Sequence, residues 1–211
     1  MTTELIIFDL DGTLVDAYKA IEKSLNFTLK RLGYPPASPY KVRRAVGWGD
    51  ENFIKTFVKD EDVKEGLLIY RRHHKTSLLR YSRVLPGVKG ILRLLKKRGY
   101  KLAVASNRPP KFSDILITHL GLKKYFDLVI CAKDKNEIKP KPDLLHRITK
   151  KLNVDPADAF YVGDMTIDVY AGKNAGIKAI AVLGGSSSKA ELKKAKPFKV
   201  ISRITELKSI K

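Results

Sequence analysis

The sequence contains a single cysteine, Cys131, among its 211 residues. One cysteine cannot form a disulfide within the chain, and it has no second thiolate with which to bind a metal ion. Cys131 lies at the end of the apolar run 126–131, so we interpret it as a packed strand residue. The cysteine content therefore excludes a disulfide scaffold and a cysteine metal site.

Long apolar runs are also missing. No run approaches the roughly 20 apolar residues of a membrane-spanning helix, and a strand begins almost at once, with no basic leader or apolar signal segment. We therefore expect a cytoplasmic protein without membrane contact. The sequence also lacks internal repeats, low-complexity linkers and the Gly-x-x-x-x-Gly-Lys-Ser/Thr phosphate-binding motif.

Acidic residues are few compared with basic ones. The chain has 42 Lys and Arg against 22 Asp and Glu, a formal net charge of +20. Clustered cations would favour a nucleic-acid partner, because they release counterions from phosphates. The lysines are instead spread along the chain, dense only at 189–199, and no nucleic-acid-binding motif accompanies them. We therefore favour a lysine-rich solvated surface that attracts anionic substrates, and keep a nucleic-acid partner as the alternative.

The most informative stretch covers residues 5–16. Its apolar start is typical of a strand buried on both faces of a parallel sheet. The strand runs directly into Asp9 and Asp11, and two acids at the end of a buried strand are costly unless they bind a cation or take part in chemistry. Ligands of open α/β sheets lie at the carboxyl ends of the strands. The stretch therefore predicts both a fold class and a metal-assisted reaction.

Helical patterns without a convincing strand follow over residues 16–81. Apolar residues recur there at helical spacing, and we expect four helices, near 21–32, 40–46, 53–58 and 61–79. We interpret this block as a small helical domain inserted after the first strand.

From residue 82 onward, helices and short apolar strands alternate. The expected strands are 101–105, 127–131, 159–162 and 178–182, and the expected helices are 88–98, 111–120, 142–152 and 167–175. A short helix from Ser188 and a strand–helix piece over 199–207 close the chain. This alternation predicts an α/β protein whose parallel sheet is covered on both faces. We assign residues 1–15 and 82–211 to the α/β domain.

Polar side chains follow the ends of these strands. The set is Asp9, Asp11, Ser106, Asn107, Lys139, Asp164 and Asp168. Because the carboxyl ends of parallel strands meet at one edge of a sheet, we expect these side chains to gather there.

This set meets the needs of phosphoryl transfer to a carboxylate. A carboxylate nucleophile divides the reaction into two steps through an aspartyl-phosphate. Its approach to a phosphate is opposed, since two like charges about 4 Å apart repel by ~4 kcal/mol at an effective dielectric near 20. A divalent cation offsets this repulsion, and oxygen-only ligands indicate Mg²⁺. A hydroxyl and a lysine can hold the remaining phosphoryl oxygens, and a second acid can move the protons.

Four motifs in this order resemble those of the haloacid dehalogenase-like hydrolase superfamily. They are Asp9-x-Asp11-Gly12-Thr13-Leu14-Val15-Asp16, Ser106-Asn107, Lys139-Pro140 and Gly163-Asp164-x-x-x-Asp168. The resemblance implies a Rossmann-like, three-layer α/β/α core with a parallel sheet. It also implies that residues 16–81 form an all-helical cap domain.

The resemblance further implies separate roles for the acids. Asp9 would be the nucleophile and Asp11 the general acid/base. Asp9, the backbone carbonyl of Asp11, and Asp164 would hold Mg²⁺. Asp168 would complete the metal site, either directly or through water, or it would bond loop amides.

Substrate binding would fall to residues of the first three motifs. Ser106 and Lys139 would bind the phosphate, and we place Thr13 and Asn107 with them. Ser106-Asn107 is also a pattern that caps a following helix. Lys139 is preferred to Lys141 because Lys-Pro-x-Pro-Asp is the family spacing.

The segment Gly47-Trp48-Gly49 lies where capped members of the superfamily often carry a substrate-specificity loop. We name Trp48 and Arg44 as candidate substrate ligands: Trp48, with Arg43 or Arg44, either faces the active site or packs within the cap. We interpret the adjacent His73 and His74 as structural, because neighbouring helical residues point about 100° apart and do not share an ion easily.

Within the superfamily, the chain looks most like the phosphoglycolate phosphatase group. The features that fit are Gly12-Thr13, Val46-Gly47-x-Gly49, Leu85-Pro86-Gly87-Val88 and Ser106-Asn107-Arg108, although Arg108 stands where many relatives have lysine. The resemblance implies a Mg²⁺-dependent phosphatase that hydrolyses a small phosphorylated metabolite. A pyrophosphatase, a nucleotidase or a sugar phosphomutase of the same superfamily is the alternative, and a nucleic-acid-binding module on an idle scaffold is a further one. The sequence indicates no oligomeric state.

Overall fold

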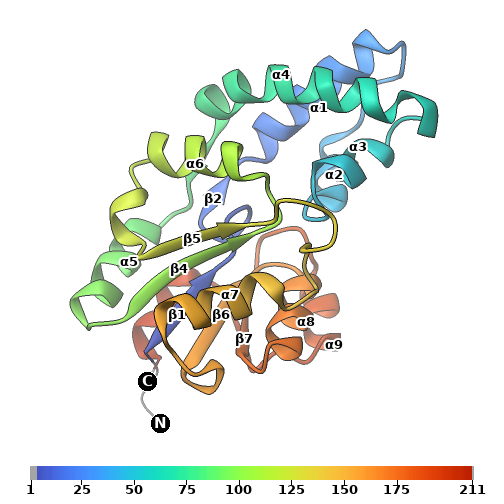
Figure 1. Cartoon of the computed structure of the whole chain (residues 1–211). Coiled ribbons are helices and arrows are strands. Elements are labelled where there is room, and N and C mark those ends of the chain that lie inside the picture. Colours follow the sequence, from blue (N-terminus) through green and yellow to red (C-terminus); the bar gives the residue numbers. More distant parts are fainter. Residues whose placement is uncertain (1–3, 211) are drawn as a thin grey trace.

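The computed structural model describes residues 4–210. Residues 1–3 and 211, which the sequence analysis assigns to the α/β domain, lie outside the described residues. Figure 1 shows a sheet flanked by helices, with a separate block of helices above the carboxyl ends of its strands.

Six strands form one parallel sheet in the order β5-β4-β1-β6-β7-β8. Their bounds are β1 (Leu5–Phe8), β4 (Lys101–Ser106), β5 (Leu128–Cys131), β6 (Ala159–Gly163), β7 (Lys178–Val182) and β8 (Lys199–Ile201). β1 lies between β4 and β6, and all four of its residues are buried. The expected strand buried on both faces is confirmed.

Helices cover both faces of the sheet. They are α5 (Val88–Lys97), α6 (Pro110–His119), α7 (Asp143–Leu152), α8 (Thr166–Asn174) and α9 (Lys189–Lys194). Alternate residues of β1 pack into different cores: Ile6 and Phe8 join apolar residues of α5 and α6, whereas Leu5 and Ile7 join those of α7 and α8. The sheet is therefore the middle of three layers, as expected.

Short 3₁₀ segments complete the described chain. They are Asp60–Asp62, Lys123–Tyr125, Pro156–Asp158 and Ile204–Ser209. The last of these follows β8. The sequence analysis expects a strand and then a helix over 199–207, and the structure has β8 and this 3₁₀ segment there.

The block above the sheet is built from helices. They are α1 (Tyr18–Arg31), α2 (Pro39–Ala45), α3 (Asp50–Lys55) and α4 (Val63–Tyr81), close to the four expected segments. α1 and α4 lie side by side and bury Ile21, Leu25 and Leu29 of α1 and Leu78 of α4 (Figure 1). Within the described residues, none of the helices combines the length and apolar character needed to span a bilayer.

A short two-stranded ribbon connects the two parts. β2 (Val15–Asp16) pairs antiparallel with β3 (Arg83–Val84), and Arg83 forms an ion pair with Asp16 at 2.8 Å. The chain enters the cap through β2 and leaves it through β3, and the backbones of the two strands pair with each other. β2 contains residues 15 and 16, and β3 begins at Arg83 after α4 ends at Tyr81; the sequence analysis predicts neither strand.

Candidate active site

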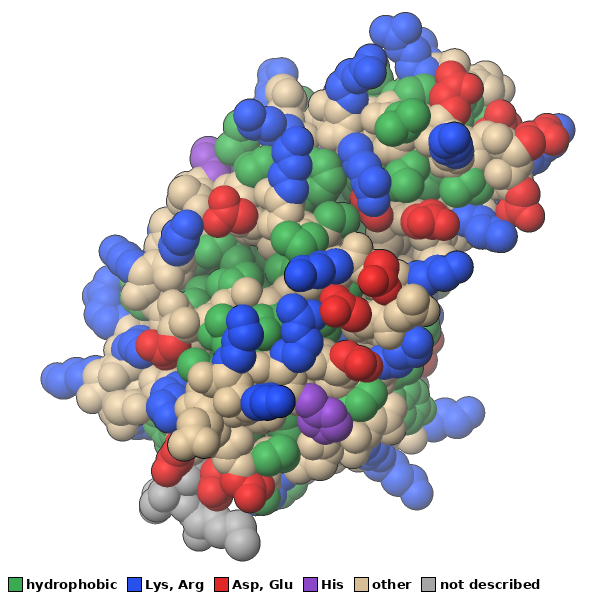
Figure 2. Space-filling view, viewed as in Figure 1, with side chains coloured by type: hydrophobic (Ala, Val, Ile, Leu, Met, Phe, Trp, Pro, Cys, Tyr) green, Lys and Arg blue, Asp and Glu red, His purple; other side chains and the backbone are tan. Residues whose placement is uncertain are grey.

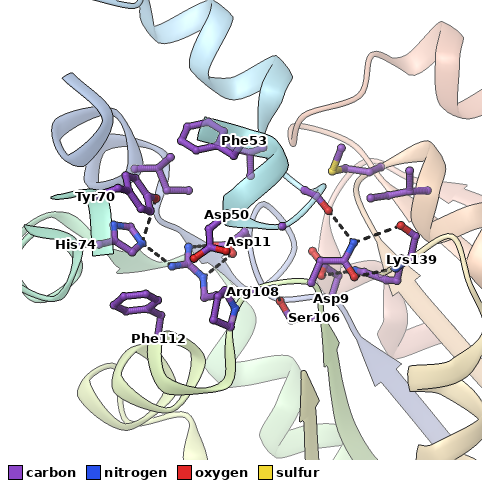
Figure 3. Close-up of a pocket in the computed structure, with 18 residues that line it drawn as sticks. Asp9, Asp11, Asp50, Phe53, Tyr70, His74, Ser106, Arg108, Phe112 and Lys139 are labelled. Atoms are coloured by element: carbon purple, nitrogen blue, oxygen red, sulfur yellow. Dashed lines mark hydrogen bonds and ion pairs between the residues drawn. The ribbon is translucent and has the colours of Figure 1, made fainter. Parts of the chain in front are cut away.

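A cavity of about 60 Å³ lies between the carboxyl ends of the strands and the cap. The α/β domain contributes Asp9, Asp11, Ser106, Asn107, Arg108 and Lys139, and the cap contributes Gly47, Asp50, Phe53, Tyr70 and His74 (Figure 3). Most of the polar side chains predicted at the strand ends thus meet at one edge of the sheet.

Lys139 is the centre of a buried hydrogen-bond cluster. Its Nζ donates to Asp9 Oδ1 at 2.6 Å, to Asp168 Oδ1 at 2.7 Å and to the Tyr161 hydroxyl at 2.8 Å. Although burial opposes its charge, the two carboxylates raise the pKa of Lys139, so it stays protonated. Lys141 is exposed, so the structure favours Lys139 as the lysine of this site.

Asp9 follows β1 and presents its two oxygens differently. Oδ1 accepts the bond from Lys139, whereas Oδ2 has no hydrogen-bond partner within residues 4–210. Burial raises the pKa of Asp9, as do Asp168 and Asp164, and Lys139 offsets this only in part. Asp9 is therefore oriented by one oxygen and open at the other.

Asp164 follows β6 and is completely buried. Its Oδ1 accepts from Thr13 Oγ1 at 3.0 Å, and its Oδ2 accepts from the Ser186 backbone N–H at 2.7 Å. Burial, with the charge of Asp168, raises the pKa of Asp164 to about 7. Thr13 thus orients a carboxylate, and this predicted substrate ligand is not among the residues that line the cavity.

Three carboxylates form the candidate metal centre. Asp9, Asp164 and Asp168 each offer an oxygen, and these atoms lie within 4.8 Å of one another. The raised pKa values of Asp9 and Asp164 indicate that this buried cluster lacks positive charge, and oxygen ligands suit a hard cation such as Mg²⁺. The residues present therefore fit a divalent cation.

Asp168 has a second task in this cluster. Its Oδ1 accepts from Lys139 and from the Tyr161 hydroxyl at 2.9 Å, and its Oδ2 accepts from the Met165 backbone N–H at 3.0 Å. These bonds engage both oxygens, so Asp168 fixes the position of Lys139 and the start of α8. Tyr161, buried on β6, is a partner that the sequence analysis missed.

The Asp11 side chain is turned to a different partner. Arg108 binds it through two bonds, from Nε to Oδ2 at 2.8 Å and from Nη2 to Oδ1 at 2.7 Å. Nη1 of Arg108 lies 2.8 Å from Nε2 of His74, a residue of the cap helix α4 (Figure 3). Burial and the charge of Arg108 lower the pKa of His74, so its ring is neutral and Nε2 accepts. His74 is structural as expected, but it also lines the cavity.

Ser106 and Asn107 hold the loop that follows β4. Ser106 Oγ accepts from the Arg108 backbone N–H at 3.2 Å. Asn107 Nδ2 donates to the Gly47 carbonyl of the cap at 2.7 Å, and its Oδ1 accepts from the Lys139 backbone N–H at 2.9 Å. Neither residue occupies the N-cap of α6, which is Pro109, so the capping alternative is wrong.

Trp48 and Arg44, the predicted substrate ligands of the cap, are not among the residues that line the cavity. Arg44 pairs with Glu191 at 2.6 Å and donates to the Ser186 carbonyl at 2.7 Å, and Trp48 is 43% exposed. Gly47 and Gly49 of the same loop do line the cavity. Gly47 has a φ of +110°, and a side chain there would collide with the Met165 sulfur, so this backbone can approach the site only as glycine.

Arg43 also points away from the cavity. Its Nη2 donates to the Gly184 carbonyl at 3.1 Å, and its guanidinium lies over the Tyr18 ring. The two arginines therefore join the cap to the loop after β7, and they do so on the outside of the site.

Comparisons with known proteins agree with this geometry. Residues 6–182 match the family model described as haloacid dehalogenase-like hydrolase. A phosphoglycolate phosphatase of Aquifex aeolicus (strain VF5) is 35% identical over 181 residues, 86% of this chain and 85% of its own length. The probable phosphatase IndB of Dickeya dadantii (strain 3937) is 34% identical, over 96% of this chain and 91% of its length. The crystal structure of a predicted phosphoglycolate phosphatase from Haemophilus somnus 129pt superimposes with a TM-score of 0.92 and 27% identity, covering 100% of this chain and 99% of that one. The chain belongs to the haloacid dehalogenase-like hydrolase family.

Proposed function

We propose that the protein is a Mg²⁺-dependent phosphatase that hydrolyses a small phosphate monoester through an aspartyl-phosphate at Asp9. The observation that carries this proposal is the asymmetry of Asp9. Oδ1 is held by Lys139 at 2.6 Å, and Oδ2 has no protein hydrogen-bond partner within residues 4–210. This is the arrangement that a carboxylate nucleophile requires, since one oxygen orients the group and the other attacks.

The side chains around Asp9 account for both steps of the reaction. Asp9 Oδ2 attacks the phosphorus and the bond to the ester oxygen breaks. Asp11, with one of its oxygens released from Arg108 and protonated, supplies the proton that the leaving oxygen takes up. Asp11 then accepts a proton from water as that water attacks the phosphorus, which releases inorganic phosphate and restores the Asp9 carboxylate. Lys139 and Ser106 stabilise charge on the phosphoryl oxygens.

The candidate metal site fits this role. Asp9 and Asp164, with the backbone carbonyl of Asp11, would hold the cation, and Asp168 would stand beside them as the anchor of Lys139. A bound Mg²⁺ supplies the positive charge that offsets repulsion between the Asp9 carboxylate and the phosphate.

Two observations support a small substrate. The cavity measures about 60 Å³, whereas pockets for larger ligands usually measure roughly 300–1,000 Å³. Relatives that match 86% and 98% of the chain are named phosphoglycolate phosphatase. We therefore propose a phosphoglycolate-like monoester as the substrate class.

The positive charge of the chain does not alter this proposal. Figure 2 shows Lys and Arg side chains spread over the visible face, with acidic side chains between them and no continuous basic stripe. Such a surface attracts small anions without forming a track for a nucleic-acid backbone.

A hydrolysis panel with Mg²⁺ tests the proposal. The panel compares phosphoglycolate, pyrophosphate, sugar phosphates and nucleotides by release of inorganic phosphate. We expect the highest kcat/KM for phosphoglycolate. A preference for pyrophosphate or nucleotides would assign the alternative activity, isomerisation of a sugar phosphate without net phosphate release would assign a mutase, and no turnover of any compound would overturn the proposal.

A further inference from the structure

We propose that Arg108 selects the substrate by binding a carboxylate on its carbon chain. On this proposal, the enzyme prefers a phosphate ester whose carbon chain carries a carboxylate to one of similar size whose carbon chain is uncharged. The inference rests on the proposed phosphatase function. It adds the substrate group that the site recognises, a carboxylate, and the residue that binds it, Arg108.

The position of Arg108 suits this role. It follows Ser106-Asn107 directly, and its backbone N–H is bonded to Ser106 Oγ, so its main chain lies next to the phosphate-binding residues. Its side chain extends from there to the cap, where it meets His74 (Figure 3). Arg108 therefore spans the part of the cavity that lies between the phosphoryl site and the wall of the cap.

Arg108 is also the cation that remains available. Within the described residues, two basic side chains other than histidine line the cavity, Arg108 and Lys139. Lys139 lies against the nucleophile Asp9, and its N–H bonds point to Asp9, Asp168 and Tyr161, so the proposed function assigns its charge to the phosphoryl group. A second anionic group on the substrate would therefore meet Arg108.

The guanidinium retains donors for such a group. Of its five N–H bonds, two point to Asp11 and one to His74. One N–H on Nη1 and one on Nη2 have no partner within residues 4–210. A carboxylate can accept from two such donors, and a guanidinium already held from two sides loses little freedom when it binds.

The surroundings strengthen this contact. Arg108 is only 8% exposed, and the aromatic rings of Tyr70 and Phe112 pack against its partner His74. An ionic hydrogen bond is stronger in such a poorly solvated place than in water. Asp50 is the acid of the cap that lines the cavity, and both its oxygens accept from Arg71, at 2.6 and 3.0 Å.

Two esters of equal size isolate the effect of the carboxylate. We would measure kcat/KM for 2-phosphoglycolate and for 2-hydroxyethyl phosphate, which carries a neutral CH₂OH group in place of the carboxylate. The wild-type protein should prefer phosphoglycolate by about 10- to 100-fold, the range expected for hydrogen bonds to a charged group.

Arg108→Met keeps an unbranched side chain of similar stem length and removes the guanidinium with all its donors. Because Arg108 also contacts Asp11, we expect this variant to turn over both esters more slowly, but the ratio of the two kcat/KM values cancels that common loss. The ratio should fall to within about threefold of unity. Arg147→Met, which removes an arginine outside the cavity, should keep the wild-type ratio.

Arg108→Lys is the second variant, in case Arg108→Met does not fold. It keeps the charge and loses the planar fork, so its ratio should lie between those of the wild type and Arg108→Met. Equal hydrolysis of both esters by the wild type, or an undiminished preference in the Arg108 variants, would overturn the inference alone. If neither ester releases phosphate, both the inference and the proposed function are overturned.

Discussion

Lys139 Nζ lies 2.6 Å from Asp9 Oδ1, so the proposed nucleophile and the lysine that would bind the phosphate are in direct contact. The contact joins residues 130 positions apart, and both side chains are almost fully buried. It leaves Asp9 Oδ2 as the attacking atom. The geometry of this pair leads to the first two predictions.

Asp9→Asn should abolish phosphate release, because an amide of nearly the same shape is a poor nucleophile. We expect kcat to fall at least about 1,000-fold, measured as inorganic phosphate from phosphoglycolate. The midpoint of thermal unfolding should stay within about 5 °C of wild type, since Lys139 keeps an oxygen partner at the same place. Retention of wild-type turnover would exclude the aspartyl-phosphate mechanism.

Asp168→Asn should slow the reaction by displacing Lys139. The variant loses the charge that anchors the ammonium, and we expect kcat to fall about 10- to 100-fold, as for other groups that orient an active-site residue. Tyr161→Phe is the matched control: it removes one neutral partner and leaves both carboxylates on Lys139, so its loss should stay below about tenfold. Equal losses in the two variants would contradict a special role for Asp168.

The sequence was sufficient to predict the sheet edge and the residues that gather there. Asp9 and Asp164 each follow an apolar strand directly, and in a parallel sheet the chain direction alone brings such residues together. The position of Lys139 could not be predicted from the end of a strand alone, because a loop separates it from β5. Its place depended on the Lys-Pro-x-Pro-Asp spacing of the family.

Side-chain contacts between residues far apart in the sequence could not be predicted. Arg108 meets Asp11 across 97 positions and His74 across 34, and periodicity reports which face a residue lies on, not which side chain it meets. The ribbon of β2 and β3 was missed because two residues per strand are too few to show alternation. For Trp48 the loop was identified, but its glycine backbone, not its aromatic side chain, lines the cavity.

Removal of divalent cations should abolish activity, and Mg²⁺ should restore it. A readout independent of activity is the midpoint of thermal unfolding, because a ligand that binds only the folded state stabilises it by about 2.7 kcal/mol at 100 times its Kd. We expect Mg²⁺ to raise the midpoint of the wild type but not of Asp164→Asn. Asp114→Asn, which changes an exposed carboxylate that is not part of the candidate metal centre, should respond like the wild type. An undiminished response of Asp164→Asn would move the metal site elsewhere.

Arg44→Ala and Trp48→Ala should each leave kcat/KM for phosphoglycolate within about threefold of wild type, the range of a surface change. Both side chains lie outside the cavity, and Arg44 is occupied by an exposed ion pair with Glu191, a kind of contact that contributes little to stability. Steady-state kinetics check this expectation. A tenfold or larger increase in KM for either variant would show that the side chain reaches the substrate during turnover.

Asp164 should make the metal-free protein less stable as the pH rises from about 4 to about 7. Its pKa is about 7 in the folded protein against an ordinary 3.8, so in this interval the folded state holds a proton that the unfolded state has released. The free energy of unfolding therefore falls with rising pH through this group. Asp164→Asn lacks the titration, so its unfolding midpoint relative to wild type should rise between pH 4.5 and 7.5, as measured by thermal unfolding in a chelator.

Asp114→Asn, at an exposed position, serves as the comparison and should show no such trend. Mg²⁺ should reduce the difference between wild type and Asp164→Asn at pH 7.5, since a bound cation favours the ionised carboxylate; a difference that does not vary with pH would contradict the raised pKa of Asp164.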